Sequence, residues 1–172
     1  GAAGPAPPSP TSSMTDSIRL RRQSDADRPF LAALYASTRT QEMAIVPWSD
    51  EQKQTFLLWQ FDAQTSHYDQ YYDGADFLII EQDGVPIGRI YIDRTPEEIE
   101  IVDIALLPEL RGAGLGSRLL RDILQEAEES GKSVKIYVEN FNPARHLYDR
   151  LGFQHVDTNG VYHLMKWTSG GA

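Results

Sequence analysis

The segment EIEIVDIALLPELRGAGLGSRLLRDILQEAEESG, residues 98–131, decides the fold of this chain. Its first ten residues, 98–107, are rich in isoleucine and leucine and are typical of a β-strand. From about 114 to 130 the apolar residues recur at the spacing of an α-helix, and Gly131 follows as a stop signal. The segment therefore predicts a strand, a glycine-rich turn and an amphipathic helix.

The turn RGAGLG, residues 111–116, lies between the predicted strand and the predicted helix. The first N–H groups of a helix have no partner within the helix, and the helix dipole adds partial positive charge there. Gly114 and Gly116 lack a Cβ atom, so phosphate oxygens can approach the backbone, and Arg111 adds a full positive charge. This arrangement favours an anion, although a glycine-rich turn on its own also fits ordinary helix-start chemistry.

Two common phosphate-binding loops do not match this turn. A P-loop requires Gly-Lys followed by Ser or Thr at its end, and the turn carries no such sequence. A dinucleotide-binding turn requires a third glycine where Ser117 stands, and it requires parallel strands, whereas the preceding strands are predicted to be antiparallel. Nucleoside triphosphate hydrolysis and dinucleotide binding are therefore not expected.

The segments on either side of this region predict one α/β domain. Strand and helix patterns alternate, and short connections make the three strands between 77 and 107 an antiparallel meander. We expect a mixed, mostly antiparallel central sheet of about six to seven strands flanked by about four helices, with residues 39–50 irregular around Pro47. The other predicted strands are 17–22, 133–139, 153–157 and 161–167, and the other predicted helices cover about 25–37, 51–64 and 142–151.

The first thirteen residues, GAAGPAPPSPTSS, contain only Gly, Ala, Pro, Ser and Thr. Such a segment can bury too little apolar surface to offset the entropy lost on ordering. We expect a disordered tag or linker at 1–13, one domain over 14–168, and a flexible tail at 169–172.

The composition excludes several classes of function. The chain of 172 residues contains no cysteine, which excludes disulfides, a cysteine nucleophile and thiolate metal sites. Its formal net charge of -9 opposes binding to nucleic acid, and it contains no apolar run long enough to cross a membrane. We therefore expect a cytoplasmic protein with no metal, nucleic-acid or membrane partner. The spacing of the four histidines is not that of metal ligands; they are His67, His146, His155 and His163.

Two motifs together resemble those of the GCN5-related N-acetyltransferase (GNAT) superfamily. The turn at 111–116 matches the family pattern Arg/Gln-x-x-Gly-x-Gly/Ala, and NPARHLYDRLGF, residues 142–153, resembles the second signature, which closes the cofactor site. The order of strands is also similar over residues 17–167. The resemblance implies a GNAT-like fold and an N-acetyltransferase that uses acetyl-CoA.

The resemblance also implies which residues bind acetyl-CoA. Leu106 would lie at a splayed strand end, where its backbone pairs with the pantetheine arm. An asparagine near the second motif would contact the cofactor, and the spacing leaves both Asn142 and Asn140 as candidates. The CoA pyrophosphate would be bound by the backbone amides of Arg111, Gly112, Ala113, Gly114, Leu115, Gly116 and Ser117.

Acetyl transfer to an amine needs a neutral nucleophile, a stabilised oxyanion and a proton for the departing thiolate. The resemblance implies Tyr148 as the proton donor, and a backbone N–H near Leu106 is a candidate for the oxyanion. Glu100 is the first choice for a general base, because its even offset predicts that it lies on the same side of the strand as Leu106. Asp103, with its odd offset, is predicted on the other face, and a relay through water is the other alternative.

The acceptor is expected to be a small-molecule or peptide amine bound by the segment 38–75. Because the chain has no cysteine, a thioester acyl-enzyme is excluded and direct transfer in a ternary complex is expected. A non-catalytic acyl-CoA sensor and a transferase of longer acyl chains are the alternatives, and pairing through 161–167 would make a homodimer. The candidate acceptor residues are Glu42, Trp48, Tyr71 and Tyr72. The alternative, that Trp48 and Trp59 fill the core, fits the sequence equally well.

Overall fold

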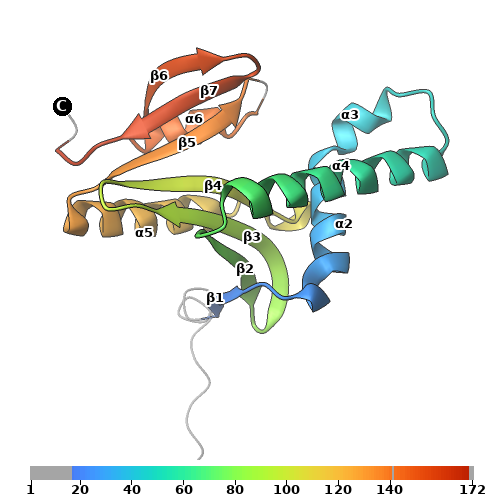
Figure 1. The fold of residues 1–172 in the computed structure, drawn as a ribbon, viewed down its shortest axis with the longest axis horizontal. Coiled ribbons are helices and arrows are strands. Elements are labelled where there is room, and N and C mark those ends of the chain that lie inside the picture. The colour runs from blue at the N-terminus through green and yellow to red at the C-terminus, as the bar shows by residue number, and fades with distance from the viewer. Residues whose placement is uncertain (1–16, 141, 171–172) are drawn as a thin grey trace, which may run out of the picture.

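The computed structural model describes residues 17–140 and 142–170 (Figure 1), so the predicted tag at 1–13 and the tail residues 171–172 lie outside the described residues. Seven strands form one sheet in the order β1-β2-β3-β4-β5-β7-β6. Neighbouring strands are antiparallel except β4 and β5, which confirms the predicted mixed, mostly antiparallel sheet. The strands are β1 Ile18–Arg22, β2 Asp76–Gln82, β3 Val85–Arg94, β4 Glu98–Leu106, β5 Ser133–Glu139, β6 Gln154–Asn159 and β7 Tyr162–Trp167.

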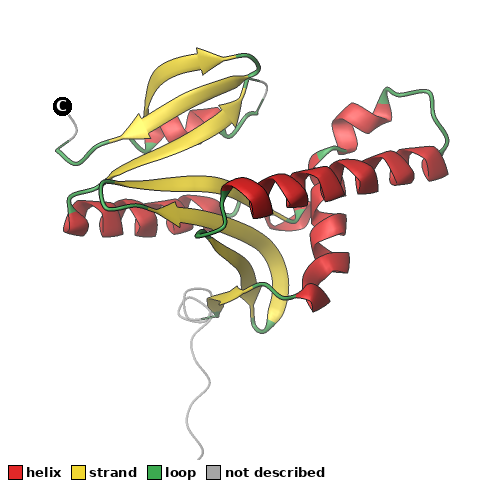
Figure 2. Ribbon diagram, viewed as in Figure 1, coloured by secondary structure: helices red, strands yellow, loops and turns green. Residues whose placement is uncertain are grey.

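The helices cover both faces of the sheet, and Figure 2 shows α4 in front of it and α5 behind it. The sequence patterns missed one short helix, because α3 has only five residues and buries none of them. They also ended α4 seven residues too early, because its last two turns are polar and tyrosine-rich rather than amphipathic. The α-helices are α2 Arg28–Thr38, α3 Thr40–Ala44, α4 Asp50–Tyr71, α5 Leu115–Ser130 and α6 Arg145–Arg150, with 3-10 turns at Asp25–Asp27 and Pro108–Leu110.

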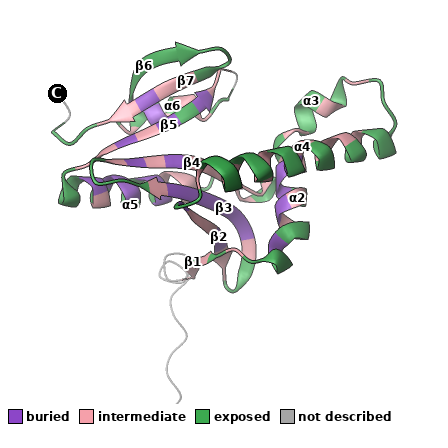
Figure 3. Cartoon of the chain, in the orientation of Figure 1, coloured by how far each residue is buried: buried purple, intermediate pink, exposed green. Residues whose placement is uncertain are grey.

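Each face of the sheet has its own hydrophobic core (Figure 3). On one face, Leu120 and Ile123 of α5 pack with buried isoleucines and valines of β3, β4 and β5. On the other face, Leu31 of α2 and Phe61 of α4 pack on Ile79 of β2. Burial on both faces explains why the central strands are almost continuously apolar.

Strands β4 and β5 are paired over only part of their length. Their register joins Glu98–Ile101 to Ser133–Ile136 and then stops. Figure 1 shows the two strands diverging beyond this point. Among the described residues, the backbone of residues 103–106 therefore has a ladder partner on the β3 side and none on the β5 side.

β4 also contains a β-bulge. Ile101 lies opposite Ile92, whereas Asp103 lies opposite the preceding residue, Tyr91, so Val102 is the extra residue. Side chains alternate between the two faces of a strand. One extra residue therefore places every later side chain of β4 on the face opposite to the one that simple alternation predicts.

The bulge changes which side chains of β4 share a face. Glu100 hydrogen-bonds to Tyr72 at the end of α4, and Asp103 pairs with Arg89 beneath α4, so both carboxylates face this helix. Leu106 packs into the core formed with α5 on the opposite face. The prediction that Glu100 and Leu106 share a face, with Asp103 on the other, is therefore wrong, because residue spacing does not reveal a bulge.

Candidate active site

The turn at 111–116 presents an exposed backbone at the start of α5. Gly112 and Gly114 have φ values of 80° and 84°, a conformation that favours glycine, and Gly114 is the N-cap residue of the helix. A Cβ atom built at either glycine would meet no heavy atom within 4 Å, so the space beside this backbone is open. The first N–H groups of α5 are therefore accessible to an anion.

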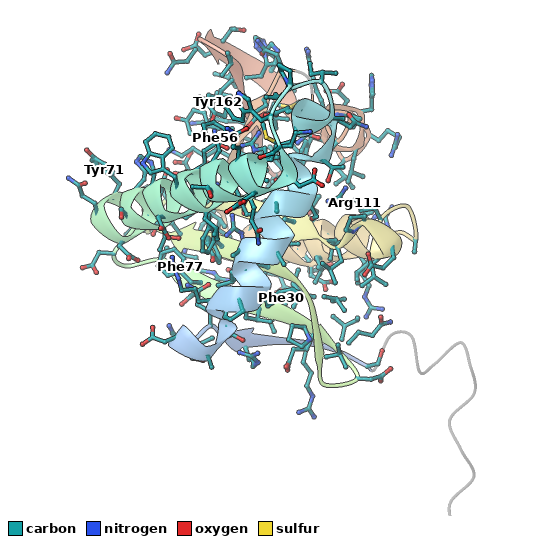
Figure 4. All side chains as sticks on the ribbon, turned by 90° about the vertical axis from the view of Figure 1, so that its right-hand side faces the viewer. Phe30, Phe56, Tyr71, Phe77, Arg111 and Tyr162 are labelled. Carbon is teal, nitrogen blue, oxygen red and sulfur yellow. The ribbon has the colours of Figure 1, made fainter. Side chains whose placement is uncertain are left out.

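The side chain of Arg111 connects this turn to the end of β4. Its Nε donates a hydrogen bond to the backbone carbonyl of Leu106, with 3.0 Å between nitrogen and oxygen. Figure 4 shows Arg111 on the flank of the molecule opposite Tyr71. The contact holds the turn beside the open edge of β4.

The open edge of β4 ends at Leu106, which lies opposite Gly88 of β3. A Cβ atom at Gly88 would overlap the carbonyl oxygen of Ala105 and lie 2.9 Å from Cδ2 of Leu106, so only glycine allows this approach. The close approach of β3 determines where the end of β4 lies. On its free side, the backbone can accept an extended ligand with amide groups, as the pantetheine arm of CoA has.

The two asparagines that the sequence left as alternatives have different environments. The Oδ1 atom of Asn142 accepts a hydrogen bond from the backbone N–H of Ala144 at 2.9 Å, which starts the turn before α6. The Oδ1 atom of Asn140 is buried and has no hydrogen-bond partner within the described residues. A buried acceptor without a partner costs about 1–3 kcal/mol, so Asn140 is the asparagine with an unused group for a ligand.

Tyr148 lies on α6 and is 3% exposed. Its ring packs edge-on against Phe153, with 5.6 Å between ring centroids. Burial and the negative charge of Asp103 raise the pKa of the Tyr148 hydroxyl above its ordinary value. The hydroxyl is therefore protonated at neutral pH, as a proton donor must be.

Glu100 is bound beneath the C-terminal end of α4. The hydroxyl of Tyr72 donates a hydrogen bond to its Oε2 at 2.7 Å, and Nζ of Lys135 lies 3.7 Å from its Oε1. Burial and this hydrogen bond raise the pKa of the Tyr72 hydroxyl. Glu100 lies in the part of β4 that is paired with β5, one residue before the last paired residue, Ile101.

A second carboxylate on the same face lies where β4 and β5 have separated. Nε of Arg89 donates to Oδ2 of Asp103 at 2.5 Å, and Nη2 of Arg89 donates to Gln64 of α4 at 2.7 Å. The rings of Tyr91 and Tyr68 lie 4.8 Å and 5.9 Å from the guanidinium carbon of Arg89. The sequence motifs did not identify Arg89, although an arginine inside the apolar strand IGRIYIDR, between Gly88 and Ile90, was a visible signal.

A comparison with known protein families identifies the family of this chain. A model described as the acetyltransferase (GNAT) family matches residues 30–153. The chain belongs to the GNAT family. The resemblance inferred from the two sequence motifs is thereby confirmed, together with the assignment as an acetyltransferase whose acetyl donor is acetyl-CoA.

Two curated relatives of this GNAT chain are ribosomal-protein acetyltransferases. The [ribosomal protein bS18]-alanine N-acetyltransferase of Haemophilus influenzae is 28% identical over 114 residues, which are 66% of this chain and 76% of the relative. The putative [ribosomal protein bS18]-alanine N-acetyltransferase of Bacillus subtilis is 31% identical over 105 residues, 55% of this chain and 69% of the relative. The solved PaiA N-acetyltransferase of Thermoplasma acidophilum, in complex with coenzyme A, has the same fold, with a TM-score of 0.67, 22% identity and coverage of 88% and 99% of the two chains.

The candidate acceptor residues of this GNAT chain do not form one cluster. Tyr72 contacts Glu100, whereas Tyr71 is 64% exposed and packs beside His67, with 4.8 Å between ring centroids. Glu42 of α3 pairs with Nη1 of Arg39 at 3.0 Å. Only Tyr72 is thus brought to a predicted catalytic residue.

Trp48 lies just before α4, and Trp59 lies in the first half of this helix. Trp48 packs edge-on against Phe56 at 5.2 Å between ring centroids and is 43% exposed, and Trp59 is 66% exposed. The alternative that these two side chains fill the core is therefore wrong.

Neither a metal cluster nor a membrane helix is found in the described part of the chain. Within residues 17–140 and 142–170, no three histidine, aspartate or glutamate side chains come together as a metal site would require. None of the helices in these ranges is long and apolar enough to cross a membrane.

Proposed function

We propose that this enzyme transfers the acetyl group of acetyl-CoA to a primary amine by direct attack within a ternary complex. The observation that carries the proposal is the open edge of β4, which ends beside the exposed turn at the start of α5. An extended amide-containing arm and an anionic pyrophosphate fit these two neighbouring features. The absence of cysteine from the chain removes a thioester intermediate.

The donor would be held by backbone groups more than by side chains. The amides of 111–117 would bind the pyrophosphate, and the free edge of β4 up to Leu106 would pair with the pantetheine arm. The buried Oδ1 atom of Asn140, which has no partner among the described residues, would accept a hydrogen bond from an N–H or hydroxyl group of acetyl-CoA.

The chemical step needs one proton donor and one oxyanion site. The protonated hydroxyl of Tyr148 would give its proton to the sulfur as the C–S bond breaks. A backbone N–H near Leu106 would stabilise the oxyanion, because the β5 side of this strand is free. Glu100 remains a candidate base, although its bonds to Tyr72 and Lys135 support a structural role.

The first acceptors to test are peptides that begin with alanine, because two relatives are named for acetylating the alanine of a ribosomal protein. We expect the purified enzyme to release CoA thiol from acetyl-CoA with at least one primary amine in a panel of such peptides, amino acids and polyamines. Mass spectrometry of the product would locate the acetyl group. CoA binding measured by calorimetry, without turnover of any amine, would instead indicate an acyl-CoA sensor.

Replacing Asn140 should weaken CoA binding more than replacing Asn142. Asn140→Ala removes the free buried oxygen, and we expect the dissociation constant for CoA to rise about tenfold, the equivalent of one hydrogen bond of about 1.4 kcal/mol. Asn142→Ala removes a turn contact and is expected to lower the unfolding temperature with a smaller change in CoA affinity. Calorimetry and thermal unfolding of both variants would test this, and the reverse order of affinities would assign the contact to Asn142.

A further inference from the structure

Arg89 forms a buried ion pair that the fold alone does not require. The arginine is 4% exposed, and the side chain of Asp103 is 25% exposed. Removing two charges from water costs several kcal/mol per ion, and apolar side chains of the same size are often at least as stabilising. The cost of this pair therefore points to a role in function.

The surroundings of Arg89 leave the Asp103 carboxylate little freedom. Gln64 accepts a hydrogen bond from one guanidinium nitrogen, and the rings of Tyr68 and Tyr91 contact the guanidinium group. The arginine in turn binds Oδ2 of Asp103 at 2.5 Å. Among the described residues, no hydrogen bond is made to the other oxygen, Oδ1.

The position of Asp103 in the strand is the second observation. The bulge at Val102 turns Asp103 to the face covered by α4, in the segment where β4 has separated from β5. Asp103 lies three residues before Leu106, and its negative charge contributes to the raised pKa of the Tyr148 hydroxyl. A carboxylate whose side chain is 25% exposed thus lies in the separated part of β4, and its charge acts on the proposed proton donor.

We propose that Asp103 receives the amino group of the acceptor, and that Arg89 is the positioning residue that holds the Asp103 carboxylate. This inference rests on the proposed function. A carboxylate that is fixed before the substrate arrives need not be reoriented during the reaction, and electrostatic catalysis depends on such preorganisation.

Asp103 would stabilise the positive charge that develops on the acceptor nitrogen during the reaction. As the neutral amine forms the new C–N bond, its nitrogen becomes positively charged, and Asp103 stabilises that charge as a hydrogen-bonded ion pair. The nitrogen then loses a proton to water. The C–S bond breaks, the sulfur takes the proton of Tyr148, and solvent returns a proton to the tyrosine.

The test compares two carboxylates on the same face of the same strand. With the best acceptor of the amine panel, Asp103→Asn should lower kcat/KM for the acceptor at least about thirtyfold, while the dissociation constant for CoA stays within about twofold. The matched variant Glu98→Gln removes a carboxylate that pairs with Lys135 and Lys166 on the same face of β4, and it should change kcat/KM by less than about threefold. A value for Asp103→Asn within threefold of the wild type would overturn the proposal.

The positioning role of Arg89 is tested by a double-mutant cycle. Arg89→Lys keeps the charge but loses the planar fork, and it should raise the KM for the acceptor without changing CoA affinity. In the Asp103→Asn variant, Arg89→Lys should have no further effect on the KM for the acceptor, whereas additive increases in KM would overturn the positioning role.

A measurement on the unaltered enzyme covers the case in which the variants do not fold. In protein labelled with ¹³C at the aspartate carboxylates and saturated with CoA, adding the acceptor should shift the Asp103 resonance. An unmoved resonance at saturating acceptor would overturn the proposal. Wild-type enzyme that turns over no amine would instead contradict the proposed function, so the two failures are distinguishable.

Discussion

Replacing Tyr148 by phenylalanine should lower kcat about 100- to 10,000-fold, which is the range for loss of a general acid or base. The change removes only the hydroxyl, because the phenylalanine ring can keep the edge-on contact with Phe153. The hydroxyl is protonated in the folded enzyme, since burial and the charge of Asp103 raise its pKa. Steady-state kinetics with a saturating acceptor would measure the effect.

Two controls separate the loss of a proton donor from a loss of structure. Calorimetry should give a dissociation constant for CoA within about twofold of the wild type, and the unfolding temperature should be nearly unchanged. If Tyr148→Phe retains full activity, water or another group protonates the thiolate and Tyr148 is a packing residue.

Replacing Gly88 by alanine should damage both the fold and the donor site. The new methyl group would overlap the carbonyl oxygen of Ala105 and come within 2.9 Å of the Leu106 side chain, so β3 or β4 must move. Overpacking of this kind lowers the free energy of unfolding by about 1–3 kcal/mol, and more where backbone atoms are involved. Because Leu106 ends the open edge of β4, we also expect CoA affinity to fall at least about tenfold.

Gly74→Ala is the matched control for this prediction. A Cβ atom at Gly74 meets no heavy atom within 4 Å, and its φ is not in the left-handed region. Denaturant unfolding and CoA calorimetry on both variants would compare the two sites. Equal stability and equal CoA affinity of the two variants would contradict the argument that Gly88 determines the position of the end of β4.

Much of the donor site could be predicted from local sequence. The spacing of apolar residues in α5, the glycines at its start and the stop at Gly131 depend on interactions within a few residues, and the structure has all three features. Tyr148 and the turn were chosen because two motifs occur together, and the family match confirms the family that these motifs indicated. The roles of the individual residues stay predictions.

The acceptor side could not be predicted in the same way. Trp48 and Tyr72 are close in sequence to the other candidates, yet one lies near the start of α4 and the other at the end of this 22-residue helix. Each residue advances a helix by about 1.5 Å, so the length of α4 separates residues that precede it from residues that follow it.

By itself, the sequence determined the order of the strands, the glycine turn at the start of α5 and the family to which the chain belongs, because each depends on patterns that are local in the chain. Only the tertiary structure decided which carboxylate faces which partner. One extra residue, Val102, exchanges the faces of β4, and only the pairing of β4 with β3 reveals it. Likewise, the partners of Arg89 come from α4, β3 and β4, and the open edge at Leu106 exists because β5 pairs with β4 over only four residues.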